Sequence, residues 1–179
     1  MKIGWAGLGA AVILIVAGVF SYRALAQQHQ TTQLASLSQQ YMVNAAELPA
    51  AGAWQSIRAI TVPGSQARSF AQALSAAQQK TQALVHVTLS GVRVQLKSAA
   101  IISRNPLTLQ AQVVIQRRFR PKGANQLDAG GTFQFANGPI PRLVEVNLTT
   151  NRSSSSTGPD GFNLNLWNMV PAGPLPHGS

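Results

Sequence analysis

The chain contains no cysteine, which excludes disulfide bonds, thiolate metal sites and cysteine nucleophiles. Its 179 residues are enough for one domain once an N-terminal segment and a C-terminal tail are subtracted. A domain of that size without cross-links must be stabilised by buried apolar side chains and by hydrogen bonds.

Carboxylates are also scarce. The chain has four, Glu47, Asp128, Glu145 and Asp160, against 14 lysines and arginines, so its formal net charge is +10. The charge therefore reflects missing acids more than abundant bases. Polar surface is supplied by amides and hydroxyls instead, including 18 glutamines.

This composition disfavours catalysis by side chains. No two carboxylates are spaced to share a local face, and His29, His86 and His177 are scattered along the chain. No nucleophile elbow, phosphate-binding loop or dinucleotide fingerprint is present. The sequence therefore predicts a protein that is not an enzyme, with no cofactor, no metal and no small-molecule ligand.

An apolar run without charge extends from Ile3 to Tyr22. At about 1.5 Å per residue, a helix of that length spans about 30 Å, the thickness of a bilayer core. Lys2 and Arg23 flank the run, and aromatic rings near both ends suit the headgroup region. The predicted membrane anchor occupies residues 1–23 and includes Ile3, Trp5, Val12, Ile13, Leu14, Ile15, Val16, Phe20 and Tyr22.

Two alternatives to an anchor remain open. Ala24-Leu25-Ala26 followed by Gln27 fits the rule for a cleaved signal peptide, which would release a soluble periplasmic or secreted protein. A buried helix of a cytosolic protein is the other. No lysine or arginine occurs between Arg23 and Arg58, so the distribution of charge favours an inner-membrane protein with its C-terminal domain in the periplasm.

Residues 24–50 are predicted to form a linking helix, because Leu34, Leu37 and Tyr41 recur at helical spacing among glutamines. The apolar stripe is thin. The helix is therefore expected either to lie along the domain or to pair with another helix, and these three residues are candidates for partner binding.

Residues 51–150 are predicted to form an α+β domain with one helix packed on a mainly antiparallel sheet. The expected elements are a strand at 56–62, a helix at 65–84, a hairpin at 85–96 turning at Ser90-Gly91, and strands at 107–116, 132–136 and 143–149, with a loop over 121–131.

The tail, residues 151–179, is rich in Ser, Pro and Gly and is predicted to be largely disordered. Within it Phe162, Leu164 and Leu166 alternate with polar residues. This segment is expected to add as a strand, either to the domain's own sheet edge or to the edge of a partner.

One dense basic cluster, Arg117 to Lys122, ends the strand at 107–116. On a pleated strand Arg118 and Arg120 point to one face, and Arg117 and Phe119 to the other. The cluster is either an ordinary solvated strand end or a docking patch, formed by Arg117, Arg118, Arg120 and Lys122, for an acidic partner or for phospholipid headgroups. Nucleic-acid binding is disfavoured because no aromatic stacking platform accompanies the cluster.

An anchor, a linking helix and a small α+β domain together resemble the bitopic inner-membrane assembly-platform proteins of type IV pili and type II secretion systems. The resemblance implies a scaffold or adaptor of a bacterial envelope machine for pilus assembly, secretion or conjugation. Such a protein pairs with other envelope proteins, or with itself, through its helix and sheet edges. The strand-rich second half departs from that family because no second helix separates pairs of strands, so no site residues are transferred from it.

Overall fold

The computed structural model describes residues 6–86, 88–120, 124–150 and 155–157. Three helices precede the sheet: α1 (Ala6–Glu47), α2 (Ala51–Ile60) and α3 (Gln66–Val85). The strands are β1 (Thr88–Arg104), β2 (Leu107–Arg120), β3 (Ala124–Ala136), β4 (Arg142–Thr150) and the short β5 (Ser155–Thr157). The predicted α+β class with an antiparallel sheet is confirmed.

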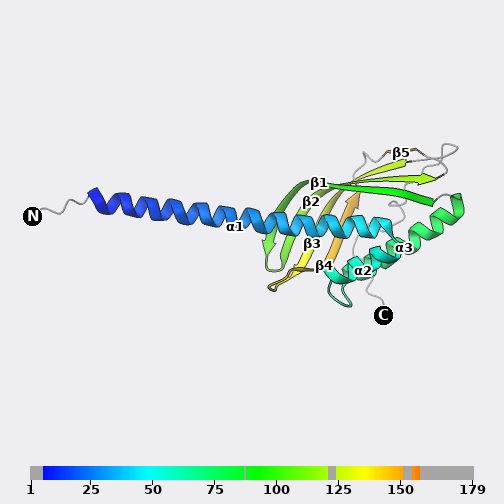
Figure 1. The fold of residues 1–179 in the computed structure, drawn as a ribbon, viewed down its shortest axis with the longest axis horizontal. Helices are drawn as coiled ribbons and strands as arrows, with labels where there is room; N and C mark the ends of the chain where they lie inside the picture. Colours follow the sequence, from blue (N-terminus) through cyan, green and yellow to red (C-terminus); the bar gives the residue numbers. More distant parts are fainter. Residues whose placement is uncertain (1–5, 87, 121–123, 151–154, 158–179) are drawn as a thin grey trace, which may run out of the picture.

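The four long strands form an antiparallel sheet in the order β1-β2-β3-β4, and β5 pairs with the beginning of β3. The sheet curves around the C-terminal half of α1, while α2 and α3 lie toward β4 (Figure 1). Alternation places one side chain in two on the inner, helix-covered face. Buried residues on that face include Leu109, Val113 and Ile115 of β2, Leu127 and Phe133 of β3, and Leu143 and Val146 of β4.

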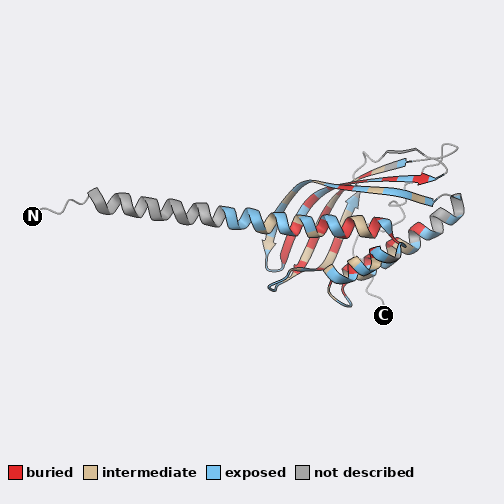
Figure 2. Cartoon of the chain, viewed as in Figure 1, coloured by how far each residue is buried: buried red, intermediate tan, exposed pale blue. Residues whose placement is uncertain are grey.

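α1 is one continuous helix of 42 residues, about 63 Å long at 1.5 Å per residue. Its C-terminal half is buried along one stripe, in which Leu34, Ser38, Tyr41 and Ala45 have no exposed surface. Its N-terminal half projects beyond the sheet (Figure 1), and in the described part of the helix burial begins only where the sheet does (Figure 2).

This arrangement corrects the prediction that Leu34, Leu37 and Tyr41 bind a partner. Leu34 and Tyr41 are fully buried in the domain's own core, and Leu37 packs against it. Of the two arrangements expected for this stripe, the helix lies along the domain. A stripe of this width gives no indication of which surface covers it, because a sheet of the same chain and a foreign helix bury it equally well.

The predicted strand at 56–62 is wrong. Residues Ala51–Ile60 form helix α2, with Ala53 and Ile57 buried four residues apart and Arg58 above the Trp54 ring at 5.3 Å. Only the end of the predicted strand is extended, where Thr61 pairs with Leu143 in an isolated bridge. Short apolar runs fit a strand and a buried helix about equally well.

The predicted hairpin turn at Ser90-Gly91 is also wrong. β1 is a single strand of 17 residues, and its pairing with β2 merely shifts between Leu89 and Gly91, as at a β-bulge. The start of the expected hairpin is wrong as well. Val85 ends α3, and His86 follows in the left-handed region with φ 51°, which stops the helix.

The predicted loop at 121–131 contains the first half of β3, which begins at Ala124. The alternation there is hidden because an inward position is occupied by glycine. A Cβ on Gly131 would lie 2.9 Å from Cε2 of Phe133 and 3.1 Å from Cδ2 of Leu148, so only glycine leaves room for these two side chains. On Gly130, which has the opposite side-chain direction, a Cβ would meet nothing closer than 3.8 Å.

A buried hydrogen bond joins α1 to α3. The hydroxyl of Tyr41 donates to the carbonyl of Ala67 at 2.7 Å, in the first turn of α3. Burial raises the pKa of the Tyr41 hydroxyl above its ordinary value, because ionisation would place a charge in the core. Tyr41 therefore stays neutral and keeps donating across the physiological range.

The Gly131→Ala variant is expected to lose about 1–3 kcal/mol of unfolding free energy, because the new methyl group overpacks Phe133 and Leu148. Gly130→Ala is the matched control and should change stability by no more than about 0.5 kcal/mol. Urea unfolding of both variants in mild detergent, followed by tryptophan fluorescence, tests this. Equal effects of the two substitutions would contradict the tight contact at Gly131.

The Tyr41→Phe variant is expected to be about 1 kcal/mol less stable at pH 7, because the Ala67 carbonyl loses its donor. In the unfolded chain tyrosine ionises near pH 10, about its ordinary value, whereas folded Tyr41 stays protonated. Ionisation of Tyr41 therefore stabilises the unfolded state of the parent chain as the pH rises above about 10. The variant has no hydroxyl at this position and lacks this effect. Unfolding free energies at pH 7 and pH 11 should show the gap between parent and variant narrowing, and a constant gap would refute the assignment.

Candidate interaction surfaces

The outer edge of β4 is closed by the chain itself. The backbone nitrogen of Val62 donates to the Leu143 carbonyl at 2.9 Å. Four residues later, at the start of α3, the Gln66 side chain bonds both backbone groups of Val146: its Nε2 donates to the carbonyl at 3.1 Å, and its Oε1 accepts from the amide at 2.8 Å. A glutamine amide thus takes the place of a neighbouring strand and covers this edge between Leu143 and Val146.

The outer edge of β1 is different. Among the described residues β1 has a strand neighbour on one side only, β2. Gln39 of α1 donates from Nε2 to the Val94 carbonyl at 2.9 Å. The strand has three irregularities in its pairing and exposes Arg93 and Lys97. Bulges and cations on an edge strand oppose pairing with an identical strand, so this edge suits a selected partner better than a second copy.

The outer face of the sheet is polar and rich in amides. Gln116 donates to Gln126 at 2.8 Å across β2 and β3, and Gln126 in turn lies 3.4 Å from an oxygen of Asp128. On β4 Asn147 donates to Glu145 at 2.7 Å. Each described carboxylate of the sheet therefore has one oxygen hydrogen-bonded to an amide, while Oδ1 of Asp128 is buried without a hydrogen bond.

The predicted basic cluster is divided between the two faces, as the alternation indicated. Arg118 and Arg120 are exposed on the outer face. The register places Gly91 opposite Arg118 and Arg93 opposite Gln116, which adds exposed Arg93 to the same face. We call Arg93, Arg118 and Arg120 the basic strand end.

Arg117 is not part of that surface, which corrects its assignment as a docking residue. Its side chain is 1% exposed and lies over the Phe119 ring, with the guanidinium carbon 6.0 Å from the ring centroid. Burial lowers the pKa of Arg117 to about 9, so the group remains cationic at neutral pH. Its side chain is therefore not part of the exposed docking surface.

Several predicted residues lie outside what the structure describes. These are Ile3 and Trp5 of the anchor, Lys122 of the basic cluster, and Phe162, Leu164 and Leu166 of the tail. Val12, Ile13, Leu14, Ile15, Val16, Phe20 and Tyr22 belong to α1, but their side chains are not described. Within the described residues, no helix combines the length and the hydropathy needed to cross a bilayer.

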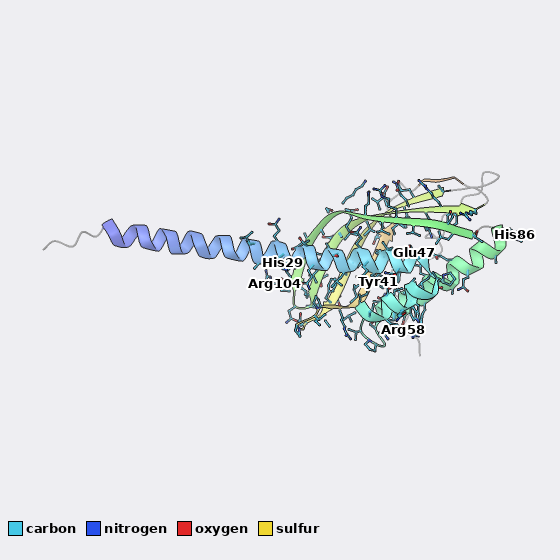
Figure 3. The ribbon with its side chains drawn as sticks, viewed as in Figure 1. His29, Tyr41, Glu47, Arg58, His86 and Arg104 are labelled. Atoms are coloured by element: carbon cyan, nitrogen blue, oxygen red, sulfur yellow. The ribbon has the colours of Figure 1, made fainter. Side chains whose placement is uncertain are left out.

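The titratable side chains do not converge in the described part of the chain. His29 lies on α1 near the point where the helix leaves the sheet, Glu47 ends the same helix, and His86 follows α3 (Figure 3). No group of three histidines, aspartates or glutamates there could hold a metal ion.

Described residues line two surface grooves. One, of about 480 Å³, lies between α1 and the end of β1 and is lined by Gln27, Thr31 and residues 99–104. The other, of about 540 Å³, lies where α1 turns into α2 and is lined by Leu48, Pro49, Trp54, Gln72, Ser75, Ala76 and Gln79. Neither combines a nucleophile with a base.

Comparison of the chain with protein-family models, with curated proteins and with solved structures gives no match. The resemblance to the assembly-platform proteins therefore stays a prediction.

Sequence reasoning missed two features of these surfaces. Arg93 joins the basic strand end only through the register of β1 on β2, which follows once the turn is placed at Asn105-Pro106. Gln66 gives no signal at all, because a glutamine in the first turn of a helix is unremarkable until a strand edge lies beside it.

Replacing Gln66 with alanine is expected to destabilise the domain by about 1–3 kcal/mol, because the amide and carbonyl of Val146 both lose their partner. Gln72→Ala, an exposed position on the same helix, is the control and should be nearly neutral. Chemical unfolding of the two variants measures the difference. If Gln66→Ala matches the control, water replaces the amide without cost and the β4 edge is not closed by this side chain.

Proposed function

We propose that the chain is a non-enzymatic scaffold or adaptor of a bacterial envelope machine. It is held in the inner membrane by residues Ile3 to Tyr22 and carries its α+β domain in the periplasm. The observation that supports this most directly is the continuity of α1, which begins in the predicted anchor and ends in the core of the domain.

A continuous helix fixes the distance and orientation between the segments at its two ends. Residues 24–46 contain neither proline nor glycine, and the helix is buried against the sheet from Leu34 onward. The domain consequently cannot swing on a flexible linker, because bending α1 would break backbone hydrogen bonds or expose its buried stripe. A fixed height and orientation above the membrane is what a scaffold needs and what a freely diffusing binding protein does not.

The surface left for a partner is the basic strand end together with the neighbouring edge of β1. Arg118 lies eleven residues along β2 from Leu107, roughly 36 Å at 3.3 Å per residue. Leu107 follows the hairpin tip beside which α1 leaves the domain, so the basic strand end faces away from the projecting helix (Figure 1). Of the two docking interpretations of this cluster, an acidic protein is therefore favoured over phospholipid headgroups, because charge effects are screened within about 8 Å at physiological salt.

Site-specific photo-crosslinking in intact cells tests the proposal. A photoreactive residue at Gln95, exposed on the outer face of β1, should form an adduct with an envelope protein, and the same residue at Gln55 on α2 should not. Charge reversal by Arg118→Glu is expected to reduce the Gln95 adduct at least about tenfold, as a lost contact of about 1.4 kcal/mol would do.

Arg58→Glu makes the same charge change on α2 and should leave the adduct unchanged. An adduct that responds equally to both reversals would indicate nonspecific electrostatics. A mature chain that begins at Gln27 and stays soluble after cell disruption would eliminate the anchor and leave the cleaved periplasmic binding protein.

A further inference from the structure

The described part of the chain exposes three large apolar side chains: Leu25 at 66%, Ile102 at 54% and Ile140 at 74%. Single exposed apolar residues are ordinary on a protein surface. These three come from α1, from β1 and from the turn between β3 and β4. Their positions in the fold bring them to one end of the molecule.

The register of the sheet places both strand connections at this end. Arg104 pairs with Leu107, Leu107 with Phe135, and Ala136 with Arg142, so the β1-β2 and β3-β4 connections lie at the same end of the sheet. Gln27 of α1 lines a groove with residues 99–104, which places the helix beside the first of these tips. We call Leu25, Ile102, Arg104, Ile140 and Arg142 the tip end.

The tip end is also basic. Arg104 and Arg142 are both exposed beside the apolar residues. Of the described carboxylates, Glu47 ends α1 on the far side and Asp128 lies within β3, while Glu145, three residues along β4 from Arg142, is hydrogen-bonded by Asn147. Apolar side chains flanked by cations are the composition of surfaces that settle on anionic bilayers.

The position of the tip end along α1 matches the height of the headgroup layer above the predicted anchor. Leu25 follows Tyr22, the last residue of the predicted anchor, by three residues, which is about 4.5 Å along a helix axis, and Gln27 follows it by about 7.5 Å. The headgroup layer on each side of a bilayer is about 5–8 Å thick. When residues 3–22 span the hydrocarbon, the β1-β2 tip beside Gln27 is therefore level with the headgroups, and the β3-β4 tip lies at the same end of the sheet.

We propose that the tip end rests on the periplasmic surface of an anionic phospholipid bilayer. Ile102 and Ile140 enter the headgroup layer, and Arg104 and Arg142 bind lipid phosphates. This inference rests on the proposed anchor and goes beyond it, because it fixes which end of the domain faces the membrane. The continuity of α1 is the reason for choosing lipid over a second copy or a foreign protein as the occupant.

The absence of cysteine makes a direct test possible. Single cysteines introduced as Ile102→Cys, Ile140→Cys and, as control at the far end of β1, Thr88→Cys are labelled with an environment-sensitive fluorophore. The full chain is reconstituted into vesicles of phosphatidylcholine and phosphatidylglycerol that contain a lipid spin-labelled at its headgroup. Quenching at positions 102 and 140 is expected to exceed that at position 88 roughly twofold or more, because the quencher acts only near the headgroups.

The outcomes separate the two proposals. A chain that fails to float with the vesicles overturns the anchor and this inference together. A chain that floats but shows equal quenching at all three positions overturns this inference alone. Quenching that depends on the amount of protein per vesicle would assign the tip end to a second copy and overturn it too.

Charge provides a second measurement. Combining Arg104→Gln with Arg142→Gln is expected to lower quenching at position 102 to the level seen in vesicles of phosphatidylcholine alone. The exposed Arg118→Gln, at the other end of β2, should leave quenching unchanged. Unaltered quenching in the double variant would overturn the part assigned to the two arginines.

Discussion

The rest of the structure depends on the burial of the C-terminal half of α1 against the inner face of the sheet. Leu34, Tyr41 and Met42 are fully buried there, and each such side chain contributes about 1.5–3 kcal/mol relative to exposure. Apolar contact alone would allow the helix to slide or rotate. Three directed hydrogen bonds prevent this: Gln39 to the carbonyl of Val94, Tyr41 to that of Ala67, and Gln78 to that of Ala46 at 3.3 Å. Burial holds the helix on the sheet, and the polar contacts fix its position along its own axis.

The same contacts explain how a chain with so few carboxylates builds a specific fold. Amides occupy places where other proteins use charged pairs: Gln66 closes the β4 edge, Gln39 joins α1 to β1, and Gln116 with Gln126 links two strands on the outer face. An amide donates and accepts at any pH, whereas a carboxylate loses its charge on acidification. A fold held in this way keeps these hydrogen bonds when the surroundings become acidic, which is a physical use for the glutamine-rich composition.

The sequence correctly predicted elements in which one face is buried along most of its length. β2 alternates from Leu107 to Val113 because its inner face is buried, although Val114 then places an apolar side chain on the outer face. α3 keeps its helical period because one face meets α1 and β4. Prediction failed where a residue satisfied two patterns at once. Gly131 is typical of a loop, but it lies in β3 where it leaves room for Phe133. The alternation around Ser90-Gly91 is typical of a hairpin, but it continues as one bulged strand.

The candidate surfaces show the same limit for a different reason. The alternation correctly separated Arg118 and Arg120 from Arg117, because pleating decides the face a side chain takes. The apolar positions of β2 from Leu107 to Ile115 continue in register to Arg117, so the pattern itself placed Arg117 on the buried face. The stripe on α1 gave no such indication, because its spacing does not show that the domain's own sheet covers Leu34 and Tyr41.

The burial of Arg117 decides which arginines of the basic cluster are exposed. Its side chain lies inside the sheet over the Phe119 ring, on the face opposite Arg118. The exposed charge of the basic strand end is therefore carried by Arg93, Arg118 and Arg120. The carboxylates nearest to it on the outer face, Asp128 and Glu145, are already engaged by amides. Three exposed arginines favour an acidic partner, as proposed above, and they lie at the end of the sheet opposite the end from which α1 projects (Figure 1).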